Sequence, residues 1–135
     1  MTQEEKDLLL KDLSARLPYG VEVEYNNINC EVLSIDKFNE ELTIWISTGY
    51  RTVVKLEDVK PYLFPLSSMT EEIMDEIYNN TGVYDIGIDS SVHIEVGTTF
   101  EDLTKIIDIL HKHHIDYRGL IPLGLAIDAT NKNIY

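Results

Sequence analysis

Three neighbouring histidines, His111, His113 and His114, are the most conspicuous set of potential metal ligands in the sequence. On a helix, His111 and His114 are three residues apart and share a face. Together with the carboxylate of Asp108 or Asp116, such imidazoles could bind zinc or nickel. However, polar or cationic side chains at the end of a helix also stabilise its dipole. We therefore expect a helix-capping role, with a metal-binding protein or enzyme using His111 to His114 as an alternative.

A second group with acid-base potential is formed by His93 and Glu95, which are two residues apart on a predicted strand and so share a face. Ser90, Ser91 or Cys30 could act as a nucleophile beside this pair. The spacing does not bring these groups together, and the sequence contains no Gly-x-Ser-x-Gly motif. Cys30 lies in an apolar strand, which predicts a buried thiol. The chain is therefore predicted not to be an enzyme.

Glycines and cysteines give no indication of a cofactor. The seven glycines are scattered, and neither a Gly-x-Gly-x-x-Gly nor a Walker-type motif occurs. The single cysteine excludes an intramolecular disulfide and a zinc site made of several thiolates. A lone thiol fits a reducing compartment. We predict a protein without a cofactor or a metal.

Aromatic side chains in the first half of the chain could form a peptide-binding face. Trp45 and Phe64 are predicted to fill the core, because a small barrel of about 45 residues needs large side chains inside. Tyr50 and Tyr62 are the predicted binding residues. Their partner would be another, unidentified protein.

The charge balance disfavours direct contact with nucleic acid or anionic membranes. The chain of 135 residues has 24 Asp and Glu against 11 Lys and Arg, a formal net charge of −13, and like charges repel. An acidic nucleic-acid mimic that occupies a DNA-binding protein is an alternative function, although such an excess is commonly a solvated surface. No apolar run approaches the ~20 residues of a membrane span, and residues 1–6 lack the basic and apolar pattern expected of a signal peptide. A cytoplasmic location is predicted.

The hydrophobic pattern predicts an α+β fold in two parts. A capping box of Thr2 and Glu5 begins a helix over about 3–16. Four short strands follow at about 21–25, 30–35, 42–47 and 51–56, then a helical turn and a last short strand. Helices are predicted near 69–79 and 99–114, with a hairpin at 83–96 between them. The boundary is placed between 1–65 and 66–135, and the apolar tail 116–129 is expected to pack back on the protein.

The segment Leu-Glu-Asp-Val-Lys-Pro-Tyr-Leu at 56–63, which follows the four strands, resembles the end of SH3-like barrels of the Tudor or KOW type. The resemblance covers residues 20–64. It implies an antiparallel β-barrel after the N-terminal helix, followed by a small C-terminal α/β region. In those families, aromatic residues on the open face bind peptides or methylated side chains.

Two longer segments, 60–72 and 115–129, are similar to parts of small uncharacterised proteins of gut Bacteroidetes and their phages or prophages. This resemblance implies a genomic setting rather than a reaction. The leading hypothesis is a non-catalytic protein-binding accessory module of a phage or mobile element. The leucine-rich face of the first helix fits either packing on the barrel or a dimer contact, so the oligomeric state stays open.

Overall fold

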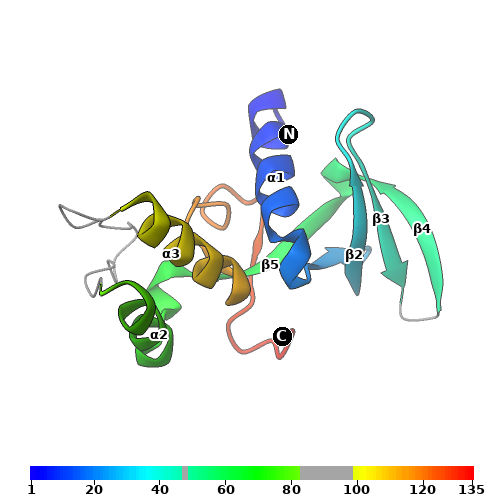
Figure 1. The fold of residues 1–135 in the computed structure, drawn as a ribbon. Coiled ribbons are helices and arrows are strands. Elements are labelled where there is room, and N and C mark those ends of the chain that lie inside the picture. Colours follow the sequence, from blue (N-terminus) through cyan, green and yellow to red (C-terminus); the bar gives the residue numbers. More distant parts are fainter. Residues whose placement is uncertain (47–48, 83–98) are drawn as a thin grey trace.

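The structure is a computed structural model that describes residues 1–46, 49–82 and 99–135, and it has an α+β fold (Figure 1). Helix α1 (Gln3–Arg16) precedes strands β1 (Glu22–Tyr25), β2 (Ile28–Asp36), β3 (Glu41–Ile46), β4 (Tyr50–Lys55) and β5 (Val59–Pro65). Helices α2 (Glu71–Thr81) and α3 (Phe100–Lys112) and the short strands β6 (Ile115–Asp116) and β7 (Ile127–Asp128) complete it. The predicted hairpin at 83–96 lies outside the described residues.

Local signals set the beginnings of the three helices. Thr2 and Glu5 form the predicted capping box of α1: the Glu5 amide donates to Thr2 Oγ1 and the Thr2 amide donates to Glu5 Oε1. Thr70 caps α2 by accepting a hydrogen bond from the Ile73 amide. This helix therefore begins two residues later than predicted. Thr99 caps α3 in the same way.

An antiparallel sheet forms the right-hand side of the molecule in Figure 1, with the strand order β4-β3-β2-β1-β5. The β1–β2 turn is tight because Asn26 and Asn27 both have positive φ, at 50° and 63°, which matches the right-handed twist of a hairpin. Among the described residues, β4 pairs with β3 alone. The ladders therefore form an open sheet, and closure into an SH3-like barrel stays a prediction.

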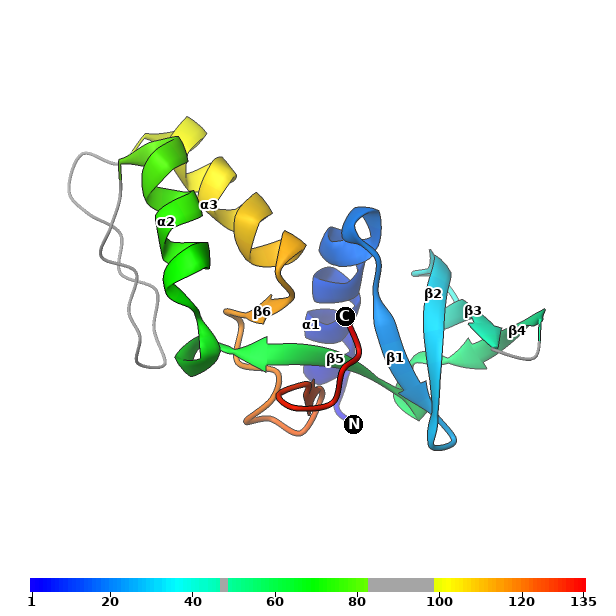
Figure 2. The same cartoon turned by 90° about the horizontal axis from the view of Figure 1, so that it is seen from below.

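Strand β5 connects the two halves of the protein. Figure 2 shows it running from the sheet to α2. Besides its antiparallel pairing with β1, it pairs in parallel with β6 through Phe64 and Ile115 and with β7 through Tyr62 and Ile127. The C-terminal tail thus packs against the strand that ends the N-terminal half, as its apolar composition predicted.

Two apolar cores lie on either side of this strand. The first joins α1 to the inner face of the sheet and includes side chains of the tail; its most buried members include Leu9, Leu13, Val23, Ile44, Leu63 and Leu120. The second lies between α2 and α3 and includes Ile77, Ile106, Leu110 and Ile115. The leucine face of α1 therefore packs on the sheet, and the first core draws residues from both sides of position 65.

A buried charged group joins α1 to the tail. Arg16 Nε donates to Asp12 Oδ2 at 2.8 Å, and both side chains are fully buried. Arg16 Nη2 also donates to the Ile115 carbonyl at 2.6 Å, and Arg118 Nε donates to Asp12 Oδ1 at 3.1 Å. The ring of Tyr117 lies 5.4 Å from the Arg16 guanidinium carbon and 5.0 Å from that of Arg118. We name Asp12, Arg16, Tyr117 and Arg118 the charged junction.

Removing one partner of the buried pair should be costly. We expect Arg16→Ala to lower the free energy of unfolding by about 3–5 kcal/mol, because it leaves Asp12 buried beside the partly exposed Arg118 alone. Lys105→Ala is the matched control, because Lys105 and Glu101 form an exposed pair at the same i, i+4 spacing. This control should cost about 0.5 kcal/mol or less. Urea denaturation measures both, and equal losses would contradict a structural role for the junction.

Candidate functional site

The three histidines of the C-terminal half do not form a metal site. Helix α3 ends at Lys112, and His114 follows it with a left-handed φ of 60°, so the prediction that His111 and His114 share a helix face is wrong. Within the described ranges, no group of three or more His, Cys, Asp or Glu side chains could hold a metal ion. His93, Glu95, Ser90 and Ser91 lie outside the described residues.

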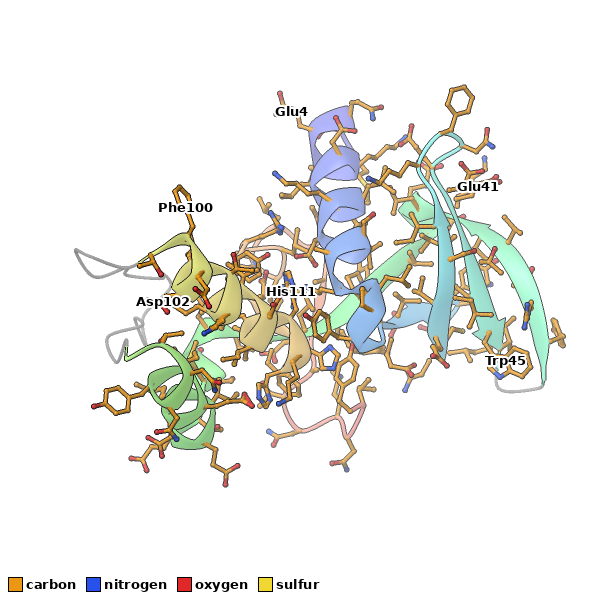
Figure 3. All side chains as sticks on the ribbon, viewed as in Figure 1. Glu4, Glu41, Trp45, Phe100, Asp102 and His111 are labelled. Carbon is orange, nitrogen blue, oxygen red and sulfur yellow. The ribbon has the colours of Figure 1, made fainter. Side chains whose placement is uncertain are left out.

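Each histidine has a different structural partner. His111, which lies between α3 and α1 in Figure 3, is buried, with Nε2 2.7 Å from the Tyr117 hydroxyl. Burial lowers its pKa, and the neighbouring Arg16 adds to this effect. His113 Nε2 lies 2.9 Å from Glu76 Oε2, and Lys112 donates to the other oxygen of Glu76 at 2.6 Å. His111 thus extends the charged junction, while His113 and Lys112 tie the end of α3 to α2.

His114 stacks on the C-terminal residue of the chain. The ring centroids of His114 and Tyr135 are 3.5 Å apart with an interplanar angle of 11°. The Tyr135 hydroxyl donates to the Tyr62 carbonyl and accepts from the Glu22 amide, so it links β5 to β1. Burial lowers the pKa of His114 to about 4 and raises that of Tyr135 to about 12. Near pH 7 both rings are therefore uncharged, and the stacked pair packs on strands β1 and β5.

The single thiol is not placed for catalysis. Cys30 is buried, as predicted, and its Sγ lies 3.6 Å from the Ile28 carbonyl. Burial raises the pKa of the thiol, and the charge of nearby Glu22 raises it further. Both effects disfavour the thiolate, which is the reactive form.

The two predicted binding tyrosines lie in different environments. Tyr50, the first residue of β4, is 58% exposed, as a binding residue must be. Tyr62 is 4% exposed, and its hydroxyl donates to Asn29 Oδ1 at 2.7 Å and lies 3.3 Å from Glu24 Oε2. The structure therefore corrects the expectation that Tyr62 lies on an open face. Strand β7 and Tyr135 pack on β5 at this point, which sequence periodicity did not reveal.

Trp45 is exposed rather than buried. It was predicted to fill the core, but its neighbour Ile44 takes that role with 0% exposure, and side chains alternate along a strand. Trp45 therefore lies on the solvent side of β3 with 39% exposure. Figure 3 shows it at the opposite end of the strand from Glu41. Phe64, the other predicted core aromatic, packs partly buried against the second core.

A row of side chains crosses four strands on this solvent side. Glu22 of β1 pairs with Glu31 of β2, Glu31 with Trp45 of β3, and Trp45 with Arg51 of β4. The guanidinium carbon of Arg51 lies 6.0 Å from the Trp45 ring centroid. Val53, two residues along β4 and 59% exposed, lies diagonally beside Trp45. We name these five residues the outer row.

The outer row has acidic residues at its β1–β2 end and a basic residue at its β4 end. Glu22 and Glu31 face each other directly, and like charges in that position destabilise a sheet. Burial raises the pKa of Glu22, and the charge of Glu31 adds to this effect. Arg51 forms no ion pair with any residue that the structure describes. Tryptophan and arginine are among the residues enriched at the anchors of protein interfaces.

No protein-family model, curated protein or solved structure shows significant similarity to this chain. In the described part of the chain, no helix is long and apolar enough to cross a membrane.

Burial of His114 makes stability depend on pH. The pKa of His114 is about 4 in the folded protein and about 6.5 when unfolded, so between these values the unfolded state binds more protons. We expect stability to fall as pH falls from 6.5 towards 4, with a contribution from His114 of about 2 kcal/mol between pH 7 and pH 5.

The variant His114→Asn tests this expectation, because asparagine tolerates the left-handed conformation. It should be less stable at pH 7, since the stacking on Tyr135 is lost, but its stability should change less between pH 7 and pH 5. Urea denaturation at the two pH values gives the difference. The same pH dependence in both proteins would show that His114 is not buried in its neutral form.

Proposed function

We propose that the protein is a non-catalytic protein-binding module, an accessory protein of a phage or mobile element that acts in the cytoplasm. The observation that carries this proposal is the exposed β3–β4 hairpin, where Trp45, Tyr50 and Val53 are 39%, 58% and 59% exposed. The genomic setting is the expectation drawn from the resemblance of segments 60–72 and 115–129 to small uncharacterised proteins of gut Bacteroidetes and their phages or prophages.

Large apolar side chains of the β3–β4 hairpin are exposed to solvent. Trp45, Tyr50 and Val53 belong to one hairpin whose six residue pairs are all in register. Trp45 and Val53 share its solvent face, whereas Tyr50, which pairs with Ile46, lies on the other face at the end of the hairpin. Their exposure leaves apolar area in water, and covering such area stabilises a complex by roughly 25 cal/mol per Å². Tryptophan, tyrosine and arginine are enriched among the residues that anchor protein interfaces. Trp45 has Arg51 on one side and Glu31 on the other.

The polar groups inside the protein support a structural rather than a catalytic use. The charged junction connects α1 to the tail. Tyr135, which stacks on His114, forms hydrogen bonds to both β1 and β5. Cys30 is buried with a raised pKa. Asp12, Arg16 and His114 are also buried and take part in packing, which leaves the surface of the described chain for recognition.

The test compares variants of the hairpin in capture of a partner from lysate of the natural host. Tyr50→Ala and Val53→Ser remove exposed side chains, so the fold should change in stability by no more than about 0.5 kcal/mol. Leu123→Ser is the matched control, because Leu123 is 53% exposed on the tail. We expect the natural protein and the control to retain the same partner, and the hairpin variants to lose at least nine-tenths of it.

The single tryptophan gives a second, independent readout. In protein labelled with fluorotryptophan, the ¹⁹F resonance of Trp45 should shift when the purified partner binds. A partner retained equally by all variants, without a shift at Trp45, would overturn the proposal. If that partner is also displaced by duplex DNA, the acidic nucleic-acid mimic becomes the better explanation.

A further inference from the structure

Among the described strands, β4 forms one edge of the sheet. Its six residues pair with β3 on one side, and among the described residues no strand pairs with the other side. Figures 1 and 2 both show it as the outermost strand, at the end of the sheet farthest from α2 and α3. The backbone amides and carbonyls along such an edge can accept a further strand. The segment itself, Tyr-Arg-Thr-Val-Val-Lys, is rich in residues that favour strands.

The solvent-facing side chains of β4 define what that strand should carry. Arg51, Val53 and Lys55 alternate along this face, and neither cation forms an ion pair with any residue in the described ranges. On the occupied side, β3 already provides a complementary row: Trp45 opposite Arg51, Thr43 opposite Val53, and Glu41 opposite Lys55. A strand added on the free side is stabilised by the same kind of cross-strand pairs.

We propose that β4 binds an extended segment of the partner by strand addition, and that the segment has the pattern acidic-x-apolar-x-acidic. The acidic residues lie opposite Arg51 and Lys55, and the apolar residue lies opposite Val53. Backbone hydrogen bonds supply affinity and the alternating side chains supply specificity. This inference rests on the proposed protein-binding function and names its mode and the chemistry of its partner.

A second copy of the chain does not fit this edge. Antiparallel pairing of two β4 strands about Val53 places Arg51 of each copy opposite Lys55 of the other. Parallel pairing in register places Arg51 opposite Arg51 and Lys55 opposite Lys55. Both arrangements set like charges directly across from each other, which destabilises the pairing. Positive charges on an edge are a common protection against self-association.

The first experiment uses a synthetic peptide, Thr-Glu-Thr-Val-Thr-Glu-Thr, which lacks tryptophan, so that emission from Trp45 reports binding at about 0.15 M salt. We expect saturable binding, and protection of β4 amides in hydrogen exchange. Two N-methylated forms of the peptide then test the backbone contact. Only every second amide of an added strand faces its neighbour. Methylation of the amides that face β4 should weaken binding at least tenfold, and methylation of the alternate amides should weaken it less than twofold.

Charge reversal tests the side-chain pattern. The variant Arg51→Glu/Lys55→Glu should bind the acidic peptide at least tenfold more weakly than the natural protein does. It should bind the basic peptide Thr-Lys-Thr-Val-Thr-Lys-Thr at least tenfold more tightly than the natural protein does. The control Lys132→Glu changes the net charge in the same direction on the exposed tail and should leave the preference unchanged.

The outcomes separate this inference from the proposed function. No binding at 2 mM peptide, equal effects of the two N-methylated forms, or no change on charge reversal would each overturn strand addition. The proposed function would still stand if Tyr50→Ala and Val53→Ser abolish capture of the partner. If the peptide does not bind and the hairpin variants still capture the partner, both the strand addition and the proposed binding surface are rejected.

Discussion

The buried guanidinium of Arg16 constrains the arrangement of the whole protein. A fully buried cation needs both a counter-charge and acceptors, and these come from Asp12 on the same helix and from the Ile115 carbonyl 99 residues later. Meeting this requirement brings the end of α3, strand β6 and Tyr117 against the end of α1. The second apolar core is thereby held beside the first, with β5 passing between them.

The position of the tail determines which aromatic residues reach solvent. Because β7 and Tyr135 pack on β5, Tyr62 is buried and its hydroxyl is used by Asn29 and Glu24. At the other end of the sheet, β4 has a neighbour on one side alone among the described strands. Covered and uncovered edges therefore lie at opposite ends of the strand order, and exposed Trp45, Tyr50 and Val53 lie near the uncovered one.

The titratable side chains divide between these two regions. Those in the interior, including His111, His114 and Cys30, have pKa values displaced by burial towards the neutral form and are engaged in packing. On the outer row, Glu22 faces the like charge of Glu31, and Arg51 lies over the Trp45 ring without an ion pair among the described residues. The first group contributes to the stability of the fold, and the second belongs to the proposed binding surface.

The sequence by itself determined the elements whose causes are local: the capping box at Thr2, the Asn26-Asn27 turn, the strand order in the chain and the apolar tail. It also predicted the buried Cys30 and the exposed Tyr50. Only the tertiary structure decided that Arg16 is buried, that Tyr62 is covered and that Trp45 faces solvent. Alternation along a strand specifies that one face is buried, but not which face, because that depends on the distant segments that cover it. Similarly, nothing in the sequence near Arg16 indicated that the Ile115 carbonyl would accept a hydrogen bond from its guanidinium.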